Sequence, residues 1–239
     1  MIVRVAYVEE PPFYSTGPDG SAIGADIELA DIVLRAVGAA SIEFISTSFG
    51  ELLTGVSAGR WEMNVPIFVT PERAQVVAFS RPVWALADGF VVRPGDPKGL
   101  TSYRAVAESA DALLGVIPGQ VQLEAARAAG VAESRLVRFA DQPAAVAALL
   151  SGEIDAFAAT ALGNRAIIES HPGLEGLTLD SSVTGAPLGA FSFSKTNHRL
   201  LDAVNGELRA YLGSDSHRRR MAQYGFGAPE IDGALGSAT

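Results

Sequence analysis

Arg73 and the aromatic ring five residues before it, Phe68, are the residues of this chain that most directly indicate chemistry. They flank a Thr-Pro-Glu turn in the stretch PIFVTPERAQVVAFSR, residues 66–81. A guanidinium is always charged and forms two parallel hydrogen bonds to a carboxylate. Such a turn joins a strand to a helix, where open α/β folds keep binding groups. The pattern predicts a carboxylate-binding arginine, and a surface arginine paired with Glu72 is the alternative.

Three phenylalanines and a glutamate indicate a place for a cation. Phe13, Phe49 and Phe68 each fall just after an expected strand, in loops that would ring one crevice. Aromatic faces attract cations by about 0.5 to 2 kcal/mol each, and Glu10 would supply a countercharge. Rings at strand ends are also typical of a core, and paired glutamates are typical of a solvated loop. Taken together with Arg73, the set predicts a pocket for a small zwitterion.

The composition excludes several other classes of function. The chain of 239 residues contains 18 basic and 27 acidic residues, which give it a net charge of −9. This charge argues against nucleic acid binding. The chain has no cysteine, its three histidines match no metal-ligand spacing, and no GxSxG, HExxH, P-loop or GxGxxG motif occurs. We therefore expect no metal and no cofactor. No apolar run approaches the roughly 20 residues of a membrane span.

The elements that must position these residues alternate between strand and helix. Strands are expected at residues 2–8, 41–47, 62–69, 113–119, 135–139, 154–160 and 185–195, and helices at 25–38, 49–60, 122–130, 141–152 and 198–213. A cluster of Pro and Gly in residues 91–100 predicts a crossover between lobes.

This order predicts an α/β fold with two lobes, each a mostly parallel sheet flanked by helices, with a ligand cleft between the lobes. Lobe 1 would comprise residues 1–94 and 192–239, and the inserted lobe 2 residues 95–191. Two crossover strands would join them and allow hinge closure, with Gly185 to Gly189 as the second hinge.

Five segments carry a resemblance to a known family. PPF, GADIELADIVLRAVG, FGELLTGVSAGRWE, TPERAQVVAFSRP and LLSGEIDAFAAT occur in the order and spacing of the family 3 solute-binding proteins of ABC importers. The chain resembles that family over nearly its whole length. The resemblance implies a periplasmic binding protein type 2 fold, a monomer, a periplasmic location with the signal peptide missing from this sequence, and delivery of a ligand to a membrane permease. A lipoprotein or the sensor domain of a receptor would look the same.

Two departures from the amino-acid-binding members of that family narrow the ligand. Those members carry a hydroxyl-bearing stretch before the arginine, where this chain has residues 66–70, Pro-Ile-Phe-Val-Thr. They also carry an aspartate, the main partner of the α-ammonium, five residues after the aspartate of a GxxDA motif. Thr160 stands there, five residues after Asp155. An α-amino acid would leave its ammonium without its usual partners, which is costly in a desolvated site.

The sequence is similar instead to the branch of the family that binds ectoine and hydroxyectoine. In that branch the ligand carboxylate meets the arginine, and its delocalised ring cation lies in an aromatic cage with a glutamate on a ring nitrogen. Glu10, Phe13, Phe49, Phe68 and Arg73 match those positions, with Phe49 where a tyrosine is expected. In lobe 2 the resemblance implies contacts from Gly119, Val121 and Thr160.

Two alternatives remain open. One is a binding protein for a polar or modified amino acid or an opine. The other is an enzyme, since cyclohexadienyl dehydratases share this fold and Arg73 would hold a prephenate carboxylate. Such an enzyme needs a positioned acid, and only Glu10 is in place, so we expect no catalytic activity. The choice between ectoine and hydroxyectoine also stays open, because one hydroxyl discriminates only where a polar group awaits it.

Overall fold

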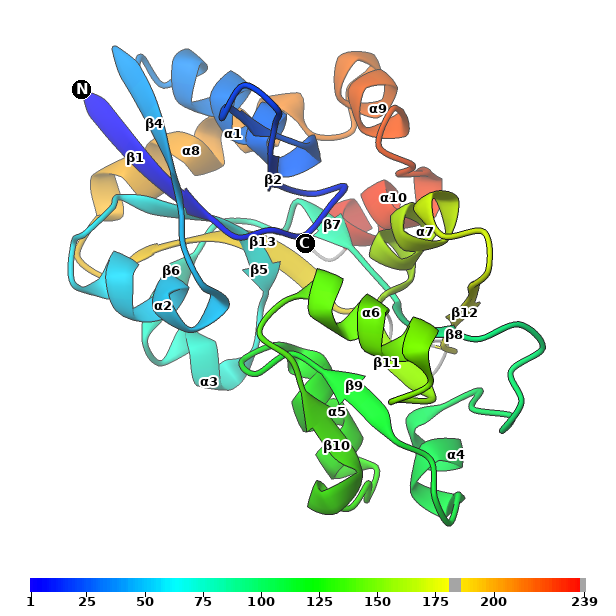
Figure 1. Ribbon diagram of the computed structural model, residues 1–239. Helices are drawn as coiled ribbons and strands as arrows, with labels where there is room; N and C mark the ends of the chain where they lie inside the picture. The colour runs from blue at the N-terminus through cyan, green and yellow to red at the C-terminus, as the bar shows by residue number, and fades with distance from the viewer. Residues whose placement is uncertain (181–185, 237–239) are drawn as a thin grey trace. The chain divides into compact units, whose positions relative to one another are not determined.

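The computed structural model describes residues 1–180 and 186–236, and the chain divides into two compact units. Lobe 1 comprises Met1–Ala85 and Pro187–Thr239, and lobe 2 is Leu86–Ala186. In Figure 1 the green and yellow-green elements belong to lobe 2. Both boundaries fall earlier in the chain than the sequence predicts, and the Gly185 end of the expected second hinge lies outside the described residues.

Strand pairing explains the shift of both boundaries. β8 (Asp88–Val92), expected in lobe 1, pairs along its whole length with β11 (Ala156–Thr160) of lobe 2. β13 (Leu188–Ser194), half of which was expected in lobe 2, lies in the lobe 1 sheet. The Pro and Gly cluster at 91–100 is therefore a loop within lobe 2 rather than the crossover.

The lobe 1 sheet has the order β4-β1-β5-β13-β6, and β7 pairs with β13. β1 runs parallel to β4 and β5, whereas β13 is antiparallel to β5, β6 and β7. The strands are β1 (Ile2–Tyr7), β4 (Ser41–Ser46), β5 (Met63–Phe68), β6 (Val77–Phe79) and β7 (Trp84–Ala85), with a separate hairpin of β2 (Ser15–Thr16) and β3 (Ala22–Ile23). The helices are α1 (Ala25–Ala36), α2 (Phe49–Ser57), α3 (Pro71–Ala74), α8 (His198–Tyr211), α9 (Asp215–Ala222) and α10 (Ala228–Gly236).

Local sequence explains why α1 begins where it does and which face it buries. Gly24, which precedes it, has a φ of 128°, and a Cβ there would lie 2.3 Å from the carbonyl oxygen of Phe13. Only glycine fits this approach. One face of the helix packs into the core, where Ile27, Ala30 and Leu34 are all buried. The helix thereby fixes the loop that carries Phe13.

The lobe 2 sheet has the order β10-β9-β11-β8-β12 and is covered by apolar clusters on both faces. Along β11, Ala156 and Ala158 enter one cluster while Phe157 and Ala159 enter the other, as the alternation of a strand requires. The remaining strands are β9 (Leu114–Val116), β10 (Leu136–Arg138) and β12 (Glu175–Thr178). The helices are α4 (Tyr103–Glu108), α5 (Val121–Ala128), the 3₁₀ helix η1 (Glu133–Arg135), α6 (Gln142–Ser151) and α7 (Ala161–Ser170).

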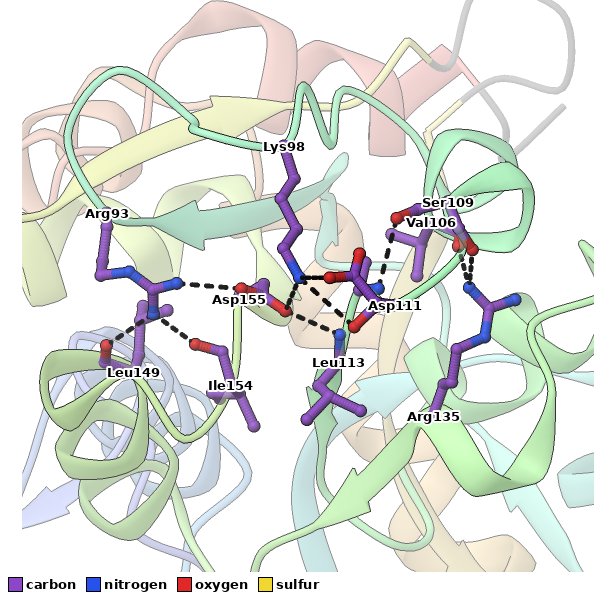
Figure 2. Close-up of polar contacts among 11 residues, drawn as sticks. Arg93, Lys98, Val106, Ser109, Asp111, Leu113, Arg135, Leu149, Ile154 and Asp155 are labelled. Atoms are coloured by element: carbon purple, nitrogen blue, oxygen red, sulfur yellow. Dashed lines mark hydrogen bonds and ion pairs between the residues drawn. The ribbon is translucent and has the colours of Figure 1, made fainter.

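Asp155 ties four segments of lobe 2 together (Figure 2). Its carboxylate accepts hydrogen bonds from Arg93 Nη2 at 2.9 Å, Lys98 Nζ at 3.0 Å and the backbone N–H of Leu113 at 2.9 Å. Arg93 also donates to two backbone carbonyl oxygens, those of Leu149 and Ile154. Burial opposes ionisation, but these donors outweigh it and hold the pKa of Asp155 below its usual value. The aspartate of the GxxDA motif is thus a structural anchor of this lobe.

The predicted α/β class is confirmed, with one correction of detail. Each sheet is mixed rather than mostly parallel, because one long strand in each lobe, β13 or β8, returns antiparallel to its neighbours. Within residues 1–180 and 186–236, no helix has both the length and the apolar character to cross a bilayer.

Candidate functional site

The predicted residues of lobe 1 follow three neighbouring parallel strands. Glu10 and Phe13 lie in the loop after β1, Phe49 is the first residue of α2 after β4, and Phe68 is the last residue of β5. Because β4, β1 and β5 are adjacent and parallel, these residues share the carboxyl edge of one sheet. Open α/β sheets bind ligands at that edge.

Arg73 is held in position by the short helix α3. Thr70 caps this helix by accepting a hydrogen bond from the Arg73 N–H at 3.2 Å, and Pro71 occupies its first turn. The side chain is only 7% exposed, and its Nη1 donates to the Phe68 carbonyl oxygen at 2.7 Å. Burial lowers the pKa of Arg73, opposed by Tyr14 and Glu10, yet arginine stays charged at neutral pH. A buried cation in this position favours an anionic ligand group.

The ring of Phe49 contacts the guanidinium group of Arg73. The guanidinium carbon of Arg73 lies over the Phe49 ring, 5.3 Å from its centroid. Cation–π attraction of this kind orients the guanidinium as well as holding it. The structure thus places Phe49 against Arg73, and the predicted role of Phe49 in caging a ligand cation stays a prediction.

Glu10 is fixed by a tight turn and by Tyr14. The Glu10 carbonyl oxygen accepts from the N–H groups of Phe13 and Tyr14, and its own N–H donates to the Tyr14 carbonyl oxygen at 2.9 Å. The Tyr14 hydroxyl donates to Glu10 Oε2 at 3.3 Å. Burial raises the pKa of Glu10 to about 7, while Tyr14 and Arg73 oppose the rise. At neutral pH this carboxyl group exchanges between its neutral and ionised forms.

The ring of Trp84 packs between those of Phe13 and Phe68, and no sequence motif identifies Trp84 as a site residue. The Trp84 ring lies edge-on to Phe68 with centroids 5.1 Å apart and 6.2 Å from Phe13. Gly189 makes room for it, since a Cβ there would lie 2.0 Å from the indole. All three rings are buried. Phe13 and Phe68 thus belong to one buried aromatic cluster around Trp84, and their role in a cation cage stays a prediction.

Asp26 contacts this aromatic cluster through Trp84. It is fully buried, its Oδ2 accepts from Trp84 Nε1 at 3.3 Å, and its Oδ1 has no partner among the described residues. Burial raises the pKa of Asp26 well above its usual value, and the nearby Glu10 carboxylate raises it further. No sequence signal identifies this residue, because Asp26 fits the acidic first turn of an ordinary helix.

The predicted residues of lobe 2 also lie at the carboxyl edge of their sheet. Gly119, with a φ of 89°, and Val121 follow β9, and Val121 begins α5. Thr160 ends β11 and caps α7, where its Oγ1 accepts from the Gly163 N–H at 3.0 Å. The side chain of Thr160 is 3% exposed, and its hydroxyl retains a proton to donate.

Metal binding finds no support in the part of the chain that the structure describes. No group of three or more His, Asp or Glu side chains there is arranged to hold a metal ion. The candidate site in lobe 1 combines one buried guanidinium, the carboxyl groups of Glu10 and Asp26, and a set of rings.

Comparison with known proteins identifies the family. Residues 3–228 match the bacterial extracellular solute-binding proteins, family 3, and the chain belongs to that family. A probable amino-acid ABC transporter periplasmic-binding protein of Sinorhizobium fredii is 28% identical over 246 residues, which cover 99% of this chain and 81% of the relative. The periplasmic binding protein type 2 fold predicted from the resemblance is confirmed.

Solved structures show the same fold. The crystal structure of EhuB in complex with hydroxyectoine superposes with a TM-score of 0.88 at 29% identity, covering 98% of this chain and 91% of that chain. An ancestral arginine-binding protein bound to arginine gives a TM-score of 0.82 at 24% identity, covering 95% of this chain and 98% of that chain. The second likeness is evidence for the fold alone.

Proposed function

We propose that this protein is the solute-binding component of an ABC importer and captures a small zwitterion of the ectoine and hydroxyectoine type. It acts as a periplasmic monomer and passes the ligand to a membrane permease. The lobe closure expected from the resemblance is part of this proposal. The observation that carries it is the buried Arg73 guanidinium in the same lobe as Glu10 and the rings of Phe13 and Phe68, all of which lie at or after the ends of strands of one sheet.

The charges of this set suit such a ligand. Arg73 favours a carboxylate, and two parallel hydrogen bonds would orient it. The ionised form of Glu10 favours a cation beside it, and the faces of Phe13 and Phe68 favour one whose charge is delocalised. A ring that carries a carboxylate and an amidinium-like cation meets both requirements. The likeness to EhuB, whose structure holds hydroxyectoine, supports the same ligand class.

The proposal is tested by isothermal titration with ectoine on protein that has been unfolded and refolded to remove any bound ligand. We expect saturable binding at micromolar affinity or better, about −8 kcal/mol. Arg73→Ala should weaken binding at least about 100-fold, because a buried, charge-assisted pair is lost. Arg35→Ala is the matched control, since Arg35 is exposed on α1 and pairs with Asp31. Unchanged affinity of Arg73→Ala would refute the assigned role.

A polar or modified amino acid, or an opine, is the second candidate ligand. The specific observation in its favour is the Sinorhizobium fredii relative, which is described as a probable amino-acid transporter component. Titration with glutamine, arginine and glycine betaine under the same conditions separates the candidates. Binding of glutamine without binding of ectoine would replace the ligand and leave the transport role standing. Incubation with prephenate should yield no phenylpyruvate.

A further inference from the structure

Asp88 lies on the binding edge of the lobe 2 sheet, although it stands far from every predicted site residue in the sequence. It is the first residue of β8, and its direct partner on the antiparallel strand β11 is Thr160. Directly opposed residues of an antiparallel pair have their side chains on the same face, about 5 Å apart at Cβ. Asp88 and Thr160 are therefore neighbours at the carboxyl end of β11.

Two neutral donors hold the Asp88 carboxylate in place. Its Oδ1 accepts from Gln122 Nε2 at 2.7 Å, and its Oδ2 accepts from the Tyr103 hydroxyl at 3.0 Å. Gln122 is the residue after Val121, so the carboxylate lies next to both lobe 2 segments on which contacts are predicted. An ionised carboxylate has about four lone-pair sites, so each oxygen can accept a further bond.

Among the described residues, no basic side chain pairs with the Asp88 carboxylate. Within residues 1–180 and 186–236, no Lys or Arg forms an ion pair with it, and its side-chain hydrogen bonds come from an amide and a phenol. Burial raises the pKa of Asp88, and those two hydrogen bonds oppose the rise. A half-buried carboxylate held by neutral donors favours a cationic donor from outside the protein.

Asp88 gives Thr160 an acidic neighbour. The sequence indicates that lobe 2 has lost the acidic group that amino-acid-binding relatives carry at that position. The structure brings an acidic group back beside Thr160, on the neighbouring strand. An acidic side chain therefore lies beside Thr160, one strand away from it.

We propose that Asp88 is the lobe 2 acceptor for an N–H or O–H group on the cationic part of the bound zwitterion. This inference rests on the proposed function and names a residue that sets its specificity. The acceptor favours ligands whose cation carries a hydrogen-bond donor, such as ectoine, hydroxyectoine or a free ammonium. It gives no advantage to a fully alkylated cation such as that of glycine betaine.

The test is a comparison of Asp88→Asn with Tyr103→Phe. Asp88→Asn keeps the size of the side chain and removes its charge and one acceptor. Tyr103→Phe removes a protein hydrogen bond to the same carboxylate but keeps the ring that packs on Phe90 with centroids 5.0 Å apart. Urea unfolding of each variant measures how much either change disturbs lobe 2. If Asp88 only stabilises lobe 2, Asp88→Asn and Tyr103→Phe should have similar ligand affinities as well as similar unfolding free energies.

Titration with ectoine and hydroxyectoine should show Asp88→Asn weakened at least about 10-fold, the range for a lost hydrogen bond to a charged group. Tyr103→Phe should stay within about 2-fold of wild type, because the acceptor remains. Equal losses in the two variants, or an Asp88→Asn affinity within 2-fold of wild type, would overturn the inference.

The wild-type titrations separate this inference from the proposed function. If wild type binds ectoine and Asp88→Asn binds it equally well, the inference fails and the proposed function stands. If wild type binds glutamine and not ectoine, the proposed ligand is wrong, and the same two variants are compared with glutamine. Its α-ammonium needs an acidic partner, so Asp88→Asn should then lose at least about 30-fold. A wild type that binds none of the three probes contradicts both proposals.

Discussion

Glu10→Gln is expected to remove a pH dependence from the stability of the ligand-free protein. Burial raises the pKa of Glu10 from 4.5 to about 7, against the opposing effects of Tyr14 and Arg73. The folded protein therefore holds this proton more tightly than the unfolded chain does. The resulting stabilisation is fully present below pH 4.5, and it is lost as the pH rises from there through 7.

The magnitude follows from the two pKa values. A difference of one pKa unit corresponds to 1.36 kcal/mol, so the change from 4.5 to about 7 is worth at most about 3 kcal/mol. Glu10 is half-buried, which makes this an upper value. Between pH 5 and pH 8 the wild type should lose about 2 kcal/mol of unfolding free energy that Glu10→Gln keeps, because glutamine resembles the neutral acid.

Urea unfolding of both proteins at pH 5, 6.5 and 8 measures this difference. The difference between the unfolding free energies of the two proteins at each pH cancels the contribution of other titrating groups, His217 among them. Glu9→Gln is the control, since Glu9 is the exposed neighbour of Glu10. Parallel curves for wild type and Glu10→Gln, within about 0.5 kcal/mol, would show that Glu10 is not desolvated and would refute the reasoning.

A ligand cation beside Glu10 should make ligand affinity depend on pH in the opposite direction to the stability of the ligand-free protein. Binding then favours the ionised form, so the affinity of wild type for ectoine should fall as the pH falls below 7. With a pKa of about 7, the loss between pH 8 and pH 5 approaches about 100-fold if Glu10 is ionised in the complex. The affinity of Glu10→Gln should not change over this range.

Three further predictions concern other parts of the molecule. Phe68→Leu should weaken ectoine binding by titration calorimetry about 3- to 30-fold, because it removes a ring face while keeping much of the volume, and a loss below 2-fold would contradict the cage. Asp155→Asn should lower the unfolding free energy by about 2 to 4 kcal/mol in urea, because it breaks a largely buried ion-pair network. The control Asp111→Asn, at an exposed partner of the same lysine, should stay within about 0.5 kcal/mol. Burial and the charge of the adjacent arginine lower the pKa of His217 to about 4. The free energy of unfolding of the wild type should therefore fall by up to about 3 kcal/mol as the pH falls from 6.5 to 4. Urea unfolding of His217→Gln should show no such loss.

The amino-acid sequence by itself determined the local elements and the residues that follow them. Apolar spacing predicted α1, and the Thr-Pro-Glu turn predicted the short helix that presents Arg73. These predictions succeed because helix periodicity and capping depend on residues within a few positions of one another. The order of such elements was enough to predict the α/β class, whereas the family was predicted from the resemblance of five sequence segments.

Tertiary structure alone decided which distant residues meet. The division between the lobes depends on β8 pairing with β11 and on β13 entering the lobe 1 sheet. Trp84 reaches Asp26 across the same lobe, and Asp88 meets Thr160 from another strand. Pairing register and side-chain packing set these contacts, and both arise from the assembled sheets rather than from any stretch of chain. For the same reason, the pKa of Glu10 depends on burial and on Arg73, which lie outside its own sequence context, as well as on the nearby Tyr14.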